Sequence, residues 1–200
     1  MNTDLLTSLK ARRSIYALNK AVPLSQDAIV NLVEDVIQET PTAFNSQTTR
    51  AVFLFGDKHD QLWDIVVKRL ETEVPTAEAY EKTKQKIASF KAAYGTILFF
   101  TDTAVVHQLE KDFTLYADNF AGWAEQAQGS GQLNTWVALA NNQIGASLQH
   151  YNPLVDELVA QAFDIPANWT LRAQMPFGGI AAPAGAKDYM DRKEQFKVLD

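Results

Sequence analysis

The feature that most constrains the fold is a continuous run of apolar residues between Gly95 and Asp102, with the sequence GTILFFTD. A strand with one solvated face alternates apolar and polar side chains, and this run does not alternate. We therefore expect a strand that is buried on both faces and lies near the middle of a sheet. Shorter apolar segments predict further strands at residues 51–56 (AVFLFG) and 169–180 (WTLRAQMPFGGI).

Segments with helical periodicity separate these strands. Ser25 is an expected N-cap for a helix that carries Ile29 and Val33 on one face and that Pro41 stops. Asn152 and Pro153 predict the start of another helix, as N-cap and first residue. Residues 122–132 (GWAEQAQGSGQ) predict a turn. Other helices are expected at residues 3–13, 59–71, 76–92, the first part of 103–120, and 132–145.

Helices between strands predict an α+β or α/β fold. The chain of 200 residues shows no repeat and no linker, so a single domain over residues 1–200 is expected. The sequence has no cysteine, which excludes disulfides, thiolate metal sites and cysteine nucleophiles. The net charge of −6 argues against nucleic acid or an anionic membrane as a partner. No apolar run approaches the roughly 20 residues of a membrane span, and no export signal is visible, so a cytoplasmic protein is expected.

Common catalytic and nucleotide-binding motifs are absent from the sequence. There is no G-x-G-x-x-G, no G-x-x-x-x-G-K-[ST] and no G-x-S-x-G. The three histidines, His59, His107 and His150, share no metal-ligand spacing, so we expect no metal. No carboxylate pair stands out either, and the sequence therefore indicates no catalytic side chain.

Three polar loop segments remain as candidate binding sites. Arg12, Arg13 and Ser14 offer two cations and a hydroxyl to a phosphate, although a cation-rich helix C-terminus is the alternative. The segment FNSQ offers donors and acceptors to the edge of a planar heterocycle, or forms a turn. The segment LQHY lies in a short connection that could pack on a flat ring or be a crowded loop. The segment FGG indicates a close backbone approach or a hairpin turn.

These segments, taken in order, resemble the nitroreductase family of flavin enzymes. The resemblance is strongest to its short branch of fungal and bacterial nitroreductase-like proteins, which is related to the fatty-acid-repression nitroreductases. It covers nearly the whole chain. The motifs that carry it are RRSIY, PTAFNSQTTR, FGDKHDQLWDIV, FKAAYGTILFFTD, YADNFAGWAEQ, IGASLQHYNPLVDEL and MPFGGIAAPAGAKD.

The resemblance implies an α+β, nitroreductase-like fold with a central mixed or antiparallel sheet flanked by helices. It also implies an intertwined homodimer with FMN at the subunit interface. The C-terminal extension, about residues 183–200, would reach across the partner subunit. Exchange of such an element is a common route to dimers.

The resemblance also implies residue roles around FMN. Arg12 and Ser14 match the family's phosphate and ribityl contacts, with Arg13 as a basic neighbour. The ring of the flavin would be reached by Asn45, Ser46 and Gln47, often from the partner subunit, and by Leu148, Gln149 and His150 near its reactive N5 edge.

One position departs from the family pattern. Relatives usually carry an arginine near the C-terminus that closes on the phosphate, and here that position is Gln195. Lys187 or Arg192 is expected to replace it. The phosphate would otherwise lose one charge-assisted partner.

The function implied by the resemblance is an FMN-dependent oxidoreductase. Hydride would pass from NAD(P)H through FMN to a nitroaromatic or quinone acceptor by a ping-pong mechanism, with no catalytic side chain. The alternatives are a flavin-binding stress or regulatory protein with incidental reductase activity, and a protein whose site no longer binds flavin. Five aromatic residues would either line the acceptor pocket or pack in the core or dimer: Phe44, Phe113, Tyr116, Phe120 and Trp123.

Overall fold

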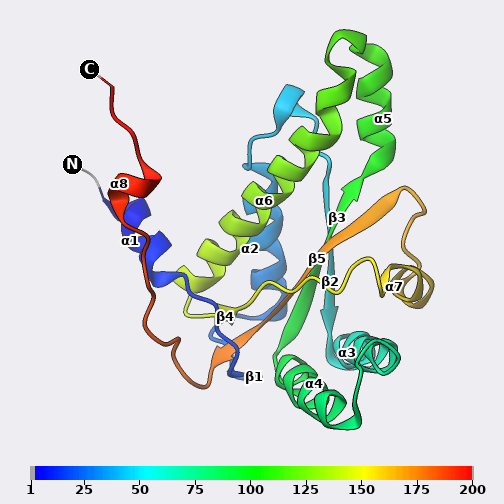
Figure 1. Ribbon diagram of the computed structural model, residues 1–200, viewed down its shortest axis with the longest axis vertical. Helices are drawn as coiled ribbons and strands as arrows, with labels where there is room; N and C mark the ends of the chain where they lie inside the picture. Colours follow the sequence, from blue (N-terminus) through cyan, green and yellow to red (C-terminus); the bar gives the residue numbers. More distant parts are fainter. Residues whose placement is uncertain (1–2, 200) are drawn as a thin grey trace.

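The computed structural model describes residues 3–199; Met1, Asn2 and Asp200, which the single-domain and tail predictions include, lie outside the described residues. Its centre is an antiparallel sheet with strand order β1-β5-β3-β2 (Figure 1). A short strand, β4, pairs with β5. The bounds are β1 (Leu18–Asn19), β2 (Thr49–Phe55), β3 (Gly95–Asp102), β4 (Gly145–Ala146) and β5 (Trp169–Ile180). The expected α+β fold and the central position of β3 are confirmed.

The apolar run in β3 is explained by two hydrophobic cores, one on each face of the sheet. Ile97 and Phe99 pack into one core, whereas Leu98 and Phe100 pack into the other. Side chains alternate faces along a strand, so burial on both sides requires a run without alternation. The first core is completed by α2 (Gln26–Gln38) and α6 (Ala117–Asn141), and the second by α3 (Gly56–Leu70), α4 (Ala77–Lys91) and the segment leading into α7 (Asp156–Phe163).

The remaining elements surround this three-layer body (Figure 1). Ser25 caps α2 as expected, because its side chain accepts a hydrogen bond from the amide of Ala28. Within the described chain, no helix is long and apolar enough to cross a membrane. The other elements are α1 (Asp4–Ala11), η1 (Ala43–Asn45), α5 (Thr103–Asp112), η2 (Thr114–Tyr116) and α8 (Arg192–Gln195).

The predicted turn at residues 122–132 is wrong, because these residues form the middle of α6, a helix of 25 residues. Gly122, Gly129 and Gly131 lower its intrinsic helix propensity. The helix nevertheless buries a row that includes Ala124, Gln128 and Thr135. Tertiary packing along this row outweighs the local cost of the glycines.

The predicted start of α7 at Asn152 and Pro153 is also wrong. The helix begins at Asp156 with Val155 in the N-cap position. The side-chain oxygen of Asn152 accepts a hydrogen bond from Gln174 on β5 at 3.4 Å, and Pro153 lies in a turn. Asn152 is thus used for contact with the sheet rather than for capping.

The FGG segment provides a close backbone approach. A Cβ atom on Gly179 would lie 2.0 Å from the carbonyl oxygen of Ala21, and one on Gly178 would lie 2.3 Å from that of Asn19. Both glycines lie in β5, where Asn19 of β1 pairs with Gly179. Only a residue without a side chain lets the two backbones meet this closely.

We expect Gly179→Ala to destabilise the protein by about 1–3 kcal/mol, since the new methyl group must push β1 away from β5. The matched control is Gly122→Ala in α6, where an added Cβ would contact nothing within 4 Å. That control should raise stability by about 0.5–1 kcal/mol, because alanine is the better helix former. Urea unfolding curves for the two variants would test the opposite signs, and equal effects would contradict the explanation.

A buried hydrogen-bond chain joins α3, α4 and β3. His59 is 1% exposed, and its Nε2 faces the carbonyl of Lys91 at 3.1 Å while its Nδ1 lies 2.9 Å from the hydroxyl of Thr96. A carbonyl only accepts, so Nε2 carries the proton and Nδ1 accepts from Thr96. The Thr96 oxygen in turn accepts from the indole of Trp63 at 3.1 Å. All three hydrogen bonds are therefore made when the imidazole of His59 is neutral.

This arrangement predicts that stability falls in mild acid. Burial lowers the pKa of His59, and the hydrogen bond to Lys91 offsets only part of that effect. The unfolded chain takes up a proton near pH 6.5, before the folded chain does, so the folded state loses stability as the pH falls below about 6.5. We expect the difference in Tm between the protein and His59→Gln to be largest at pH 7.5 and to shrink towards pH 5.5. A difference that stays constant over this range would contradict the assignment.

Candidate cofactor site

The segment Arg12–Ser14 leaves the first helix instead of ending it. The structure stops α1 at Ala11, two residues earlier than expected, and Arg12 has an extended backbone. Its guanidinium lies over the ring of Trp136 on α6, 4.4 Å from the ring centroid. The Nε atom of Arg12 is buried and has no hydrogen-bond partner. A buried donor without a partner is costly, so this position favours a ligand that accepts.

The electrostatic surroundings of Arg12 indicate the charge of that ligand. Burial, and then the neighbouring Arg13, lower the pKa of Arg12. Both effects disfavour the cationic form, and a nearby anion would favour it and so oppose both of them.

Arg12 and its neighbours line a cavity of about 510 Å³. Its walls are residues 12–17 on one side and residues 182–185 with Lys187 on the other. Three cations, Arg12, Arg13 and Lys187, belong to this lining, which contains no carboxylate. Arg13 also donates to the carbonyl oxygen of Gly185 at 2.8 Å, which joins the two walls. Arg192, the other expected substitute for the family arginine, is not part of this lining.

Ser14, in the wall of this cavity, pairs with β4, which ends two residues before the strip that contains Leu148, Gln149 and His150. Ser14 forms a parallel bridge with Ala146, whose carbonyl oxygen accepts from the amide of Ile15 at 2.9 Å. Trp136 donates to the same oxygen at 3.1 Å. One carbonyl group of β4 therefore connects the chain after Ser14 and α6 to the segment that precedes Leu148.

The three residues of the strip differ in exposure. Gln149 is buried, pairs with Gln174 through the backbone, and donates from its amide to the hydroxyl of Ser147 at 3.0 Å. Leu148 is half-buried against the α2–α6 core, and His150 is exposed. The side chains available to a ligand at this strip are thus those of Leu148 and His150, whereas Gln149 fixes the strip to the sheet.

The third segment, Asn45–Gln47, lies at the other end of α6. Phe44 packs on Trp123, and Arg12 packs on Trp136, thirteen residues further along the same helix. At 1.5 Å per residue the two contacts are roughly 20 Å apart along the helix axis. The structure of one chain does not bring this segment to the cavity beside Arg12.

The loop at residues 44–47 has an unusual backbone that the sequence did not reveal. Phe44, Asn45 and Gln47 have φ values of 57°, 50° and 47°. Such left-handed conformations cost roughly 1–3 kcal/mol each for a residue other than glycine, and they concentrate at functional sites. No sequence signal marks them, because glycine, the usual signal, is absent from this loop.

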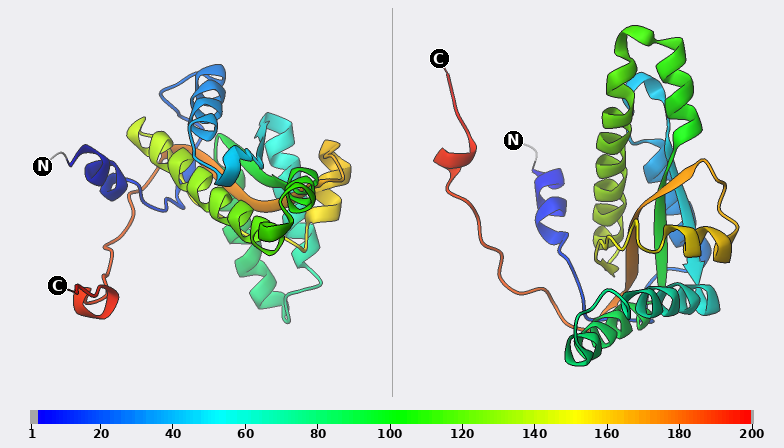
Figure 2. Two further views of the ribbon diagram at one scale, coloured as in Figure 1. Left: turned by 90° about the horizontal axis from the view of Figure 1, so that it is seen from above. Right: turned by 45° about the vertical axis from the view of Figure 1, so that its right-hand side comes forward.

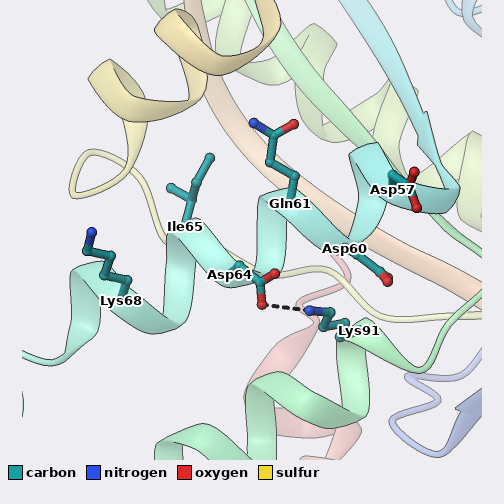
Figure 3. Close-up of a pocket in the computed structure, with 7 residues that line it drawn as sticks. All are labelled: Asp57, Asp60, Gln61, Asp64, Ile65, Lys68 and Lys91. Carbon is teal, nitrogen blue, oxygen red and sulfur yellow. Dashed lines mark hydrogen bonds and ion pairs between the residues drawn. The ribbon is translucent and has the colours of Figure 1, made fainter.

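A second hollow lies away from all predicted site residues. Figure 3 shows it on α3 and α4, where its volume is about 440 Å³. Asp57, Asp60 and Asp64 line it together with Lys68 and Lys91, and Asp64 forms an ion pair with Lys91 at 2.6 Å. Within residues 3–199, no group of three or more histidines and carboxylates is placed to hold a metal ion. These mixed charges are typical of a solvated surface.

The fold and the cavity define a class, an α+β protein with a cationic pocket beside its sheet. Comparisons with known proteins make this more specific. The model of the Nitroreductase family matches residues 9–179. In Saccharomyces cerevisiae, HBN1 is 41% identical over 92% of this chain and 92% of its own length, and the nitroreductase FRM2 is 37% identical over 94% of both.

A solved structure is similar to this chain over nearly its whole length. The nitroreductase CinD from Lactococcus lactis, solved with nicotinic acid, is 47% identical, with a TM-score of 0.91 over 98% of this chain and 100% of that one. The same protein has been solved with 4-nitrophenol and with chloramphenicol. The chain belongs to the nitroreductase family, as its sequence motifs indicate, and is therefore a flavin-dependent oxidoreductase.

Proposed function

We propose that this protein uses FMN to reduce nitroaromatic or quinone acceptors at the expense of NAD(P)H. The observation that carries the proposal is the cavity beside Arg12, which combines three cations with a buried guanidinium nitrogen that has no partner. A phosphate monoester is the natural occupant of such a pocket, since arginine binds phosphate oxygens through charge-assisted hydrogen bonds. A protein of this fold from Desulfovibrio desulfuricans, 20% identical with a TM-score of 0.69, is solved with FMN.

The residues around the cavity fit the parts of FMN. Arg12 and Arg13 would hold the phosphate with Ser14 as a neutral donor, and Lys187 would supply the charge that Gln195 does not. Arg192 is the weaker candidate, because it does not line the cavity. Leu148 and His150 would border the flavin ring from the adjoining strip.

The bound cofactor would supply the redox chemistry by accepting hydride from NAD(P)H and then, in a ping-pong sequence, reducing the acceptor. The side chains of this protein bind and orient, and none is proposed as nucleophile or base. Five aromatic residues gather at the end of the α5–α6 hairpin, where three of them, Phe44, Phe113 and Tyr116, are 40–49% exposed. Their rings suit a flat acceptor, and CinD binds 4-nitrophenol and chloramphenicol.

A homodimer would unite the two ends of α6. If the segment Asn45–Gln47 contacts the flavin, the roughly 20 Å separation requires that it do so from a second chain. The proposed extension at residues 183–200 supports this assembly. After β5 the chain leaves the body and runs away from it (Figure 2), with Tyr189, Phe196 and Val198 61–84% exposed. Apolar side chains placed this way favour burial against a second copy.

The second candidate is a flavin-binding stress or regulatory protein with incidental reductase activity. Such a protein would have the same fold and bind the same cofactor. Neither of these determines the biological role. We place either protein in the cytoplasm, since a chain without cysteine suits a reducing compartment.

The visible spectrum of the purified protein is the first test. We expect flavin absorption bands, either directly or after addition of FMN and removal of the excess. Steady-state oxidation of NADH or NADPH with 4-nitrophenol or a quinone would then separate the two candidates. Turnover supports the enzyme, whereas tight flavin without turnover supports the regulatory protein. A protein that stays colourless after FMN addition would refute both.

A further inference from the structure

We propose that Phe44 is a positioning residue, whose ring anchors the strained loop that presents Asn45, Ser46 and Gln47 to the flavin. The anchor is an aromatic clamp, which we define as Phe113, Tyr116, Phe120 and Trp123. This proposal rests on the proposed function and adds a residue that has no expected contact with FMN.

The backbone of the loop requires an anchor. Phe44 has φ 57° and ψ 22°, and Asn45 and Gln47 also lie in the left-handed region. Aromatic residues rarely adopt this conformation, because their side chain crowds the following carbonyl. Three such residues among four positions persist only where the surroundings hold them.

The clamp holds the ring of Phe44 from several sides. The ring centroid of Phe44 lies 4.8 Å from that of Phe113 and 5.3 Å from that of Phe120. Tyr116 and Trp123 follow at 5.8 and 6.0 Å, with the Trp123 ring nearly parallel at 21°. These rings come from the C-terminal end of α5, from η2 and from α6, so one side chain connects the loop to the whole hairpin.

The position of Phe44 differs from that of a core residue. Its side chain is 49% exposed, and it belongs to neither of the two sheet cores. Burial of apolar area therefore explains only part of its placement, whereas four ring contacts in tilted, edge-on and stacked geometries fix its orientation.

Hydrogen bonds fix the opposite side of the loop. The amide of Gln47 donates to the hydroxyl of Thr42 at 3.0 Å, and its carbonyl oxygen accepts from Arg50 at 2.6 Å. No hydrogen bond in the described part of the chain engages the side chains of residues 45–47. The loop thus has a fixed backbone and free polar side chains, which is how a preorganised binding segment is built.

The test compares three variants. Phe44→Ala removes the ring, Phe44→Tyr retains it, and Leu115→Ala is a control in the same hairpin, where Leu115 is 83% exposed. In the flavin-free protein, amide hydrogen exchange at residues 45–47 should be at least about tenfold faster in Phe44→Ala and within about twofold of the parent in the other two. Thermal unfolding of each variant checks that the body remains folded.

The second readout is the flavin itself. Titration of each flavin-free variant with FMN should give a Kd about tenfold higher for Phe44→Ala, with an altered absorption band of the bound flavin, and rescue by Phe44→Tyr. Unchanged exchange in Phe44→Ala would overturn the proposal. Faster exchange with an unchanged Kd and spectrum would overturn the role towards FMN.

The proposed function and the positioning role of Phe44 are tested separately by these variants. A parent protein that does not bind FMN would refute the proposed function and, with it, the flavin role of Phe44. A parent that binds FMN normally, together with a Phe44→Ala variant that also does, would refute the positioning role alone.

Discussion

Replacing Arg12 with alanine should release FMN from the protein. The variant loses the guanidinium whose buried Nε atom has no partner in the chain. A hydrogen bond to a charged group contributes about 1.5–3 kcal/mol, so we expect FMN to bind roughly 10- to 100-fold more weakly. Fluorescence titration of the flavin-free protein with FMN measures the loss.

Two further variants make this prediction specific. Arg12→Lys retains the charge but not the planar fork, so an intermediate Kd is expected. Lys10→Ala removes an exposed cation from the last turn of α1 and should leave the Kd unchanged. If Arg12→Ala kept its flavin, the phosphate would have to bind elsewhere. If Lys10→Ala lost as much affinity as Arg12→Ala, the effect would come from net charge rather than from the cavity.

Deletion of residues 192–200 should convert the proposed dimer into monomers and lower the flavin content with it. The segment carries three exposed apolar side chains, Phe196, Val198 and Leu199. The monomer should still fold, since Ala184 is the one residue between 181 and 199 that packs against a core cluster. Light scattering after gel filtration gives the mass, and the visible spectrum gives the flavin content.

Point variants separate the apolar contacts from the length of the tail. The double variant Phe196→Ser and Leu199→Ser should weaken the dimer in the same direction as the deletion, because it removes apolar area that association would bury. Glu194→Ala, in the exposed α8, should leave the mass unchanged. A deletion variant that remains a dimer and keeps its FMN would show that the tail does not hold the assembly together.

The sequence predicts the sheet better than it predicts the helices that cover it. The run GTILFFTD indicates β3, because burial on both faces requires a continuous apolar run, which can be recognised from the sequence alone. The strand direction is not encoded in that pattern, since an antiparallel strand reads the same when helices cover both faces. The turn expected within α6 fails because its glycines are offset by packing along a row of buried residues from Phe120 to Leu139.

The sequence proposes residues for the candidate site but does not predict their arrangement. Ser14 and Ala146 are far apart in sequence, and a backbone bridge places them side by side, two residues before the strip at 148–150. A contact of this kind depends on the completed sheet, so no local pattern contains it. The strained backbone of Phe44 is equally hidden, because a left-handed phenylalanine carries no compositional signature.

The length of α6 has a genetic consequence. In the proposed dimer, each flavin would take its phosphate contacts from one chain and the loop at residues 45–47 from the other. A chain damaged at Arg12, paired with a chain damaged in that loop, leaves one site doubly impaired and the other intact. Two inactive alleles of this gene should therefore complement each other. Random pairing of the two chains would restore roughly a quarter of the full number of flavin sites.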